Sequence, residues 1–270
     1  MEKNKISAYD RVLLARSKDR PGIRDYIEEL FGDFTELKGD RLGKEDSSIL
    51  GGIGMFHGIP VTVIGHRKGK TTEENIRFNF GMTSPEGYRK ALRLMRQAEK
   101  FHRPVITFID TPGAYPGIEA ESNGQSTAIA ESIAAMSSLK TPVITIITGE
   151  GSSGGALALA SADSIWMLEN AVYSILSPEG FASILWKDSK RAAQACEMMK
   201  ITAQDLLEFG LIDGIVPENE KLFENIDQLL QREITRLLKL RESEIVKRRY
   251  RKFRKFDEKY ITSEKRGVER

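Results

Sequence analysis

The sequence predicts an α/β fold in which parallel strands alternate with helices. Short β-branched runs recur through the middle of the chain, turn residues follow them, and segments with helical apolar spacing lie between them. With 270 residues, 40% apolar and 30% charged, the chain can bury a sizeable core. We expect one functional domain in three parts: an N-terminal helical arm (1–48), a core (49–218) and an amphipathic, basic C-terminal helix (219–270).

The N-terminal arm is predicted from apolar residues at helical spacing within 1–48, most clearly between Ile23 and Phe31. Pro21 suits the start of that helix, and Gly32 suits its end. Such an arm can wrap around its own domain or around a partner, and the sequence favours neither.

Composition excludes several classes of protein. The single cysteine, Cys196, rules out a disulfide framework and a cysteine zinc site within the chain. The N-terminus lacks the apolar stretch of a signal peptide, and no run of about 18 apolar residues could span a membrane. We therefore expect a cytoplasmic protein, and the net charge of +2 indicates no particular partner.

Two apolar runs, Ile49–Phe56 and Ile59–His66, predict a β-hairpin. Residues 65–71 follow it and resemble a nucleotide-binding P-loop, but only three residues separate Gly65 from Gly69, where the motif requires four. We expect a basic loop that contacts a partner or a ligand phosphate rather than an ATP site.

Further elements follow in order. Ser-Pro-Glu-Gly occurs at 84–87 and at 177–180, and two ordinary helix starts explain this better than an internal repeat. The remaining predicted elements are strands at 104–110, 143–148, 164–168, 173–177 and 211–216 and helices at 128–136, 201–209 and 219–257.

The most informative stretch is 141–159, where a buried strand, a glycine-rich segment (149–155) and a buried helix follow one another. The first N–H groups of a helix have no internal partners, so this order can present backbone donors to an anion or a developing oxyanion. The loop at 111–117 follows the preceding strand and should lie at the same edge of a parallel sheet. Close helix–strand packing is the alternative explanation for the glycines.

Residues 151–155 also fit the G-x-S-x-G motif of a serine nucleophile. A nucleophilic Ser153 would need a base, but His57, His66 and His102 all precede it, whereas the hydrolase order places histidine after serine. A lysine base stays open. Backbone donors are therefore the preferred interpretation, and a serine hydrolase using Ser153 is an alternative.

Five motifs resemble the α subunits of bacterial acetyl-CoA carboxylase carboxyltransferases. They are PEGYRKALRLM (85–95), FIDTPGAYPG (108–117), GEGSSGGALAL (149–159), SPEGFASILW (177–186) and RRYRKFRK (248–255). The resemblance implies a crotonase-like (ClpP/crotonase) fold of repeated β-β-α units with added terminal helices. It implies a biotin-dependent enzyme subunit that moves a carboxyl group from carboxybiotin, on the biotin carboxyl carrier protein, to acetyl-CoA. The product is malonyl-CoA for fatty acid biosynthesis.

The resemblance also implies partners and site residues. The α chain acts with a zinc-bearing β subunit in an (αβ)₂ assembly, beside the carrier protein and an ATP-using biotin carboxylase, and holds no metal itself. Gly154 and Gly155 would polarise the biotin ureido oxygen, and biotin would serve as the base. Substrate contacts are implied at Gly113, Ala114, Tyr115, Gly117, Gly151, Ser152 and Ser153.

Two positions depart from the family pattern. Ser122-Asn123 stands where Glu-Arg is usual, so an ion pair from an arginine at 123 is not expected. Family members often have glycine at the position of Ser152, and this small change beside Gly154 and Gly155 need not alter their backbone N–H donors.

Other functions stay open. The subunit could act on another acyl-CoA, such as propionyl-CoA. Within the same fold, an enoyl-CoA hydratase or isomerase would need carboxylates, for which Glu119, Glu121 and Glu150 are candidates. A scaffold subunit that binds through its terminal helices is a non-enzymatic alternative. The basic run near the C-terminus is expected to be solvated or to face a partner rather than to bind nucleic acid.

Overall fold

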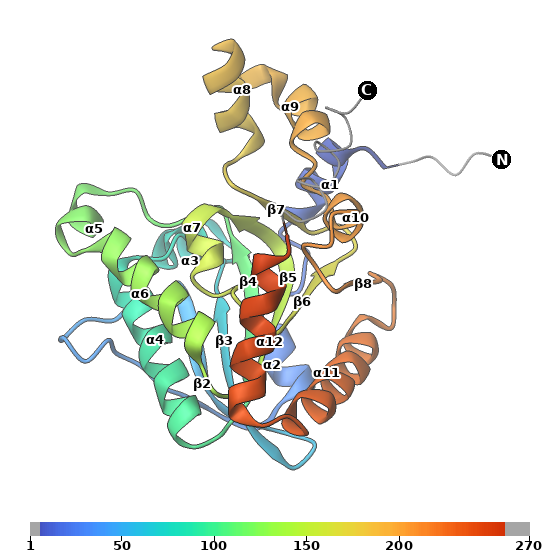
Figure 1. The fold of residues 1–270 in the computed structure, drawn as a ribbon. Coiled ribbons are helices and arrows are strands. Elements are labelled where there is room, and N and C mark those ends of the chain that lie inside the picture. The colour runs from blue at the N-terminus through green and yellow to red at the C-terminus, as the bar shows by residue number, and fades with distance from the viewer. Residues whose placement is uncertain (1–5, 257–270) are drawn as a thin grey trace, which may run out of the picture.

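An eight-stranded mixed sheet organises the chain in the computed structural model, which describes residues 6–256 (Figure 1). The strand order is β1-β2-β3-β4-β5-β6-β8, and β7 pairs with β5. The strands are β1 (Gly32–Glu36), β2 (Ile49–Phe56), β3 (Ile59–His66), β4 (Val105–Thr111), β5 (Val143–Ser152), β6 (Ser164–Leu168), β7 (Val172–Ser174) and β8 (Gly214–Val216). The pairs β1–β2 and β2–β3 are antiparallel, and all other pairs are parallel. The predicted α/β class and the hairpin are confirmed.

Helices lie on both faces of the sheet, with α4 and α6 on one side and α2 and α11 on the other (Figure 1). The helices are α1 (Ala8–Ala15), α2 (Ile23–Leu30), α3 (Thr72–Arg77), α4 (Pro85–Lys100), α5 (Ile118–Ser122), α6 (Gln125–Ser138), α7 (Ser153–Leu157), α8 (Pro178–Trp186), α9 (Ala192–Met199), α10 (Ala203–Glu208), α11 (Leu222–Leu238) and α12 (Glu242–Arg254), with short 3₁₀ turns at Asn79–Gly81 and Ser189–Arg191. Both predicted Ser-Pro helix starts are confirmed, and Ser177 caps α8 by accepting a hydrogen bond from the Gly180 amide. None of the helices in the described residues is both long and apolar enough to cross a membrane.

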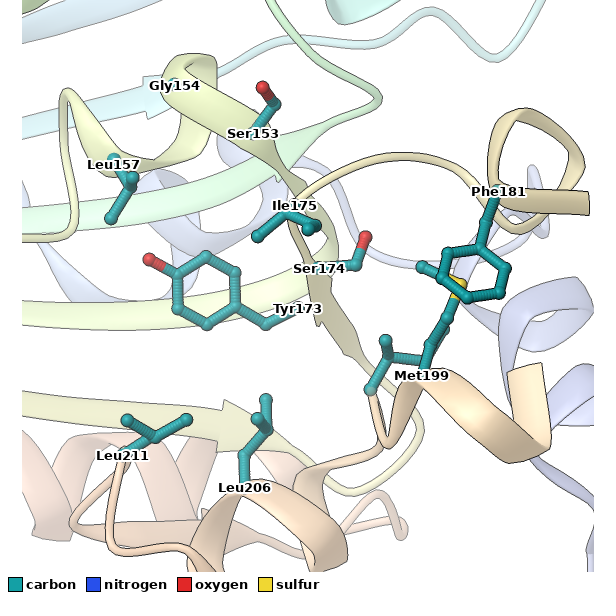
Figure 2. A pocket seen from close by; sticks show the side chains of 11 residues that line it. Ser153, Gly154, Leu157, Tyr173, Ser174, Ile175, Phe181, Met199, Leu206 and Leu211 are labelled. Atoms are coloured by element: carbon teal, nitrogen blue, oxygen red, sulfur yellow. The ribbon is translucent and has the colours of Figure 1, made fainter. Parts of the chain in front are cut away.

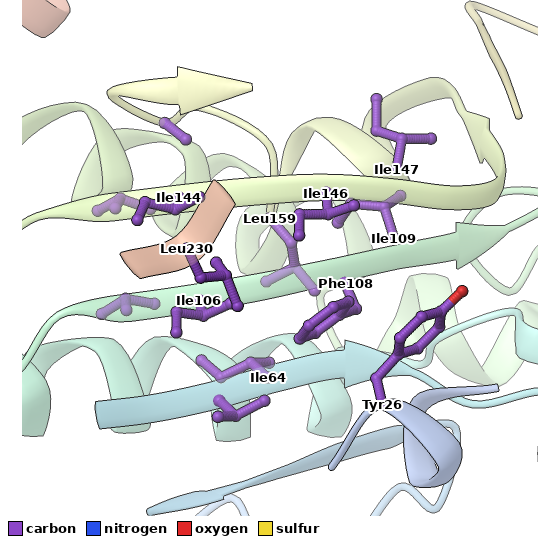
Figure 3. Close-up of a cluster of buried hydrophobic side chains, with 14 of the residues drawn as sticks. Tyr26, Ile64, Ile106, Phe108, Ile109, Ile144, Ile146, Ile147, Leu159 and Leu230 are labelled. Atoms are coloured by element: carbon purple, nitrogen blue, oxygen red, sulfur yellow. The ribbon is translucent and has the colours of Figure 1, made fainter. Parts of the chain in front are cut away.

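The central strands β4 and β5 form the middle of the core (Figure 3). Their β-branched side chains are buried on both faces, as parallel strands covered by helices on each side require. Helix α2 covers one of these faces, where the ring of Tyr26 stacks on that of Phe108 with centroids 5.0 Å apart. This part of the N-terminal arm therefore packs on its own domain.

Helices α1 and α2 match the helical spacing predicted for the N-terminal arm, but residues 32–36 within the predicted arm form strand β1, and residues 1–5 lie outside the described residues. This strand pairs with β2 at a place where glycine permits close approach. A Cβ atom on Gly52 would lie 2.1 Å from the Thr35 carbonyl oxygen. The segment thus extends the sheet by one antiparallel strand, and the sheet is mixed rather than wholly parallel.

The prediction of one C-terminal helix over 219–257 is also wrong for the residues the structure describes. The chain forms α11 and α12, with Arg241 in an extended conformation between them. Neither glycine nor proline marks this break. Several strand bounds also differ, since β5 runs on to Ser152 through the glycines at 149 and 151, and β8 spans only 214–216.

Candidate active site

Two strand-end segments meet at the carboxyl edge of the sheet. After β4 the chain passes through Gly113 and Ala114, and after β5 it enters α7, which contains Gly155. A Cβ atom on Gly155 would lie 2.7 Å from the Ala114 nitrogen and 2.9 Å from the Gly113 carbonyl carbon. The predicted meeting of the two loops is confirmed, and only glycine fits at 155 without displacing the neighbouring backbone.

The amide N–H groups of Ala114, Gly154 and Gly155 donate to no group within residues 6–256. Their neighbours are bonded, since the Gly113 amide donates to Thr111 Oγ1 (3.1 Å) and the Tyr115 amide donates to the Thr83 carbonyl (3.0 Å). Ser152 precedes α7 but provides no side-chain cap. Two strand-end segments thus present free N–H groups side by side, and hydrogen bonds of the neighbouring residues hold the segments in place. An oxyanion hole requires such an arrangement of donors.

A cavity of about 430 Å³ lies beside Gly154 (Figure 2). Its walls come from α7, β7, α8, α9 and α10 and are mostly apolar. The lining residues are Ser153, Gly154, Leu157, Tyr173, Ser174, Ile175, Phe181, Met199, Ile201, Leu206 and Leu211. Phe181 and Met199 belong to the helix pair α8–α9, which projects from the body of the molecule (Figure 1). The cavity therefore lies where this projection joins the sheet.

The predicted substrate-contacting residues divide among several places. Ser153 and Gly154 line the 430 Å³ cavity, whereas Tyr115 lines a separate polar cavity of about 240 Å³. Gly151 and Ser152 are buried within β5 and do not line the larger cavity. Gly117 packs against the ring of Tyr115, since a Cβ atom at position 117 would lie 2.4 Å from Tyr115 Cε1.

Ser153 adopts a left-handed conformation with φ of 58°, as a strained turn between strand and helix would. Its hydroxyl group, however, forms no hydrogen bond with any described residue. His57 contacts Asp227 (2.7 Å), His102 contacts Glu242 (3.2 Å), and His66 is buried at the end of β3. The part of the chain that the structure describes provides no base for Ser153.

A partly buried ion network lies at the ends of β3, β4 and β5, and the sequence analysis did not predict it. Lys68 Nζ contacts Asp110 Oδ1 (2.7 Å) and Glu150 Oε2 (3.1 Å). Arg16 contacts Glu150 Oε1 (2.8 Å) and continues to Glu179 on α8 (2.7 Å). Burial alone would lower the pKa of Lys68, but the charges of Asp110 and Glu150 outweigh it and raise that pKa. The partners are far apart in sequence, so no local pattern could have revealed them.

The ion network bears on two predictions from the sequence, the acid–base carboxylates of a hydratase and the P-loop-like segment at 65–71. Glu150 is engaged with two cations and its side chain is 8% exposed, so it is not a free acid–base group of the hydratase type. Glu119 lines the smaller polar cavity, and Glu121 is exposed on α5. In the 65–71 loop, Lys68 is neutralised internally and Thr71 caps α3, so the P-loop resemblance has no structural counterpart.

Comparison with known proteins identifies the family. A sequence model described as "Acetyl co-enzyme A carboxylase carboxyltransferase-like" matches residues 2–257. An acetyl-coenzyme A carboxylase carboxyl transferase subunit alpha from Carboxydothermus hydrogenoformans is 56% identical over 257 residues, covering 92% of this chain and 80% of the relative. The alpha subunit from Halalkalibacterium halodurans is 54% identical, covering 94% and 80%. A protein of Clostridium tetani named for subunits beta/alpha is 54% identical, covering 93% of this chain and 45% of the relative.

Solved structures agree with the expected fold. Transcarboxylase 12S, with methylmalonyl-coenzyme A and methylmalonic acid bound, matches with a TM-score of 0.68 and 19% identity, covering 86% of this chain and 46% of that one. The beta subunit of geranyl-CoA carboxylase from P. aeruginosa matches with a TM-score of 0.67 and 17% identity, covering 87% and 46%. At this identity the likeness shows the fold alone, and it confirms the predicted crotonase-like architecture. The chain belongs to the acetyl-CoA carboxylase carboxyltransferase family, among the α subunits, and is a biotin-dependent enzyme subunit.

Proposed function

We propose that this chain, together with a β subunit, transfers the carboxyl group of carboxybiotin to acetyl-CoA and so forms malonyl-CoA for fatty acid biosynthesis. The observation that carries the proposal is the set of unpaired N–H groups at Ala114, Gly154 and Gly155, which the fold holds where two strand ends meet. Relatives of this chain that are 54–56% identical to it are named as acetyl-coenzyme A carboxylase carboxyl transferase subunits alpha.

These donors suit the oxygen that gains charge during transfer. When a carboxyl group leaves carboxybiotin, negative charge develops on the ureido oxygen of the ring. We assign Gly154 and Gly155 to that oxygen, with Ala114 as a neighbouring donor. Preorganised amides need not reorient as the charge develops, and one such donor typically contributes about 3–4 kcal/mol to transition-state stabilisation.

The cavity beside Gly154 suits the ring that would carry this oxygen. Its walls are mostly apolar, and no carboxylate, histidine or lysine is among its lining residues. This chain therefore provides binding and polarisation here, and the proton of the acetyl methyl group passes in this proposal to the biotin ring that has lost its carboxyl group or to a group of the β subunit. Biotin, carried by the carrier protein, and the CoA thioester are both substrates of this site.

The projecting helices α8 and α9 are the surface that we assign to the β subunit. Their apolar side chains Ile184, Leu185 and Met198 are 69%, 51% and 55% exposed, and Ile175 at the cavity is 78% exposed. Uncovered apolar groups beside a site indicate an interface. The Clostridium tetani relative, named for both subunits, supports such a pairing in one polypeptide. In this proposal the β subunit contributes the zinc site and most of the thioester site of a cytoplasmic (αβ)₂ assembly, which the carrier protein and biotin carboxylase supply with carboxybiotin.

The test is a substrate comparison on the assembly purified with its native β subunit. Carboxylated carrier protein is offered with acetyl-CoA or propionyl-CoA, and the acyl-CoA products are measured. A clear preference for acetyl-CoA is expected. Preference for propionyl-CoA would reassign the substrate, and hydration of crotonyl-CoA without carboxyl transfer would replace the proposal by the hydratase alternative.

A further inference from the structure

Two buried side chains beside the amides of Ala114 and Gly155 hold polar atoms without hydrogen-bond partners. These atoms are Gln125 Oε1, at the start of α6, and Tyr88 Oη, in α4. Gln125 is 3% exposed and Tyr88 is fully buried. Thr83 lies near the Tyr88 hydroxyl but outside hydrogen-bonding geometry, and its own hydroxyl accepts from Ser48 Oγ at 3.1 Å. Buried polar atoms are nearly always paired, so each exception requires an explanation.

Gln125 fixes the segment that carries the Ala114 amide. Its Nε2 donates to the Tyr115 carbonyl (2.9 Å) and to the Thr83 carbonyl (2.8 Å), and Thr83 also pairs with Ala114 across a β-bridge. The opposite amide orientation would direct Oε1 at two carbonyl oxygens, so the network determines which atom is the donor. One side-chain amide therefore fixes the backbone immediately after Ala114.

Tyr88 supports the other half of the site. Its hydroxyl oxygen would lie 2.8 Å from a Cβ atom on Gly155, while the Ala114 nitrogen would lie 2.7 Å from the same position. Gly155 is thus enclosed between the Tyr88 hydroxyl and the backbone of Ala114. A displacement of the Tyr88 ring would release Gly155 from one side.

We propose that Gln125 and Tyr88 are positioning residues for carboxyl transfer. Gln125 sets the place of the Ala114 amide through its paired Nε2, and Tyr88 sets that of the Gly155 amide through its unpaired hydroxyl group. The inference rests on the proposed function. It gives the Tyr88 hydroxyl a different signature from an ordinary core group, because removing this unpaired atom should spare the fold but slow the reaction.

Tyr88→Phe tests the Tyr88 half, because it removes only the hydroxyl group. In the purified assembly with the β subunit, we expect an unchanged or raised melting temperature, a kcat lower by about threefold to tenfold and KM values within about twofold. Ser137→Ala, on the exposed part of α6, is the control and should change none of these. A lower melting temperature or an unchanged kcat for Tyr88→Phe would overturn its role.

Gln125→Glu and Gln125→Met test the Gln125 half by pH dependence. An ionised carboxylate offers no donor to the two carbonyl groups, whereas a protonated one offers one O–H. The activity of Gln125→Glu relative to the parent should therefore rise as the pH is lowered from 8 to 6. Methionine has no donor at any pH, so the activity of Gln125→Met relative to the parent should stay low and flat.

The outcomes separate this inference from the proposed function. A parent assembly without carboxyl transfer would refute the proposed function. An active parent with equally active Gln125 variants, or variants with the same pH profile, would overturn the inference alone. If neither Gln125 variant assembles, Gln125 serves folding and its positioning role is likewise overturned.

Discussion

The two glycines of α7 differ at the residue scale, although the sequence predicts the same role for both. A Cβ atom on Gly154 would make an ordinary contact with Ile129 Cγ2 at 3.4 Å. A Cβ atom on Gly155 would press on the Ala114 backbone and on the Tyr88 hydroxyl. Helix α7 therefore has room for alanine at position 154. Position 155 requires glycine, because any side chain there would push the Gly155 amide away from the Ala114 backbone.

Paired alanine substitutions make this difference measurable. Gly154→Ala keeps the amide donor and should leave kcat within about threefold of the parent. Gly155→Ala displaces the Ala114 segment, so kcat should fall by about tenfold or more and the melting temperature should fall with it. Assembly state, melting and carboxyl transfer are measured on one preparation of each variant. Normal kinetics for Gly155→Ala would remove Gly155 from the site.

Ser153 should behave as a turn residue rather than a nucleophile. Ser153→Ala is expected to keep kcat within about threefold, since nothing among the described residues activates its hydroxyl. Ser153→Gly should raise stability by about 1 kcal/mol, because glycine adopts the left-handed conformation at no steric cost. Loss of activity by several orders of magnitude in Ser153→Ala, or labelling of Ser153 by a fluorophosphonate, would support a hydrolase instead.

His66 introduces a pH dependence of stability. It is 2% exposed. Burial is the main cause that lowers its pKa to about 3, and the Lys68 charge adds to this effect. Between pH 6.5 and about 3 the unfolded chain binds a proton that the folded chain excludes. His66 therefore destabilises the fold progressively as the pH falls below 6.5, by about 1.4 kcal/mol per unit.

The measurement is the free energy of unfolding in urea between pH 8 and pH 5. His66→Leu should show a shallower loss on acidification than the parent, by about 2 kcal/mol over the interval from 6.5 to 5. His102→Leu is the control, because the His102 side chain is 77% exposed. Parallel curves for the parent and His66→Leu would show that His66 is not excluded from protonation in the fold.

At the scale of elements, local signals predicted most of the fold. Alternation of apolar runs and turns located β2, β3, β4 and β5, and Ser-Pro dipeptides marked the starts of α4 and α8. The sequence could not reveal β1, whose edge position depends on a distant glycine, Gly52. Nor could it reveal the break before α12, which no glycine or proline marks. The strand-end loops of the site were predictable, whereas Gln125, Tyr88 and the Lys68 network depend on long-range packing.

Helix α12 shows why a basic run need not be a solvated face. Arg249 within it is buried, pairs with Asp163 Oδ2 (2.6 Å), and donates to the carbonyl groups of Met136, Leu139 and Thr141. Lys252 pairs with Asp213. These contacts fix α12 on the end of α6 and on the segment before β6, while Arg251 and Arg254 face outward.

Arg249→Ala should destabilise the fold by about 3–5 kcal/mol, because it leaves the buried Asp163 carboxylate and the carbonyl groups without a donor. For a chain of this size the melting temperature should fall by roughly 10 °C. Arg251→Ala, on the exposed side of the same helix, is the matched control and should change the melting temperature little. Equal melting of Arg249→Ala and the parent would show that the buried ion pair does not anchor α12.

At the scale of the whole molecule, we propose that the described chain holds half of a reaction site. It presents backbone donors and an apolar cavity, but the cavity has no carboxylate, histidine or lysine in its lining. The projecting helices beside it expose apolar side chains that an isolated protein would keep covered. We therefore propose that this chain positions and polarises one substrate, and that a second chain completes the site.

The most direct test is carboxyl transfer in the reverse direction, from malonyl-CoA to a free biotin derivative, measured for this chain alone, for the β subunit alone and for the two together. Acetyl-CoA should form only in the mixture, and the rate should saturate as the second chain is added, because each half lacks groups that the other provides. Substantial turnover by this chain alone, or a correctly assembled mixture without transfer, would contradict the claim.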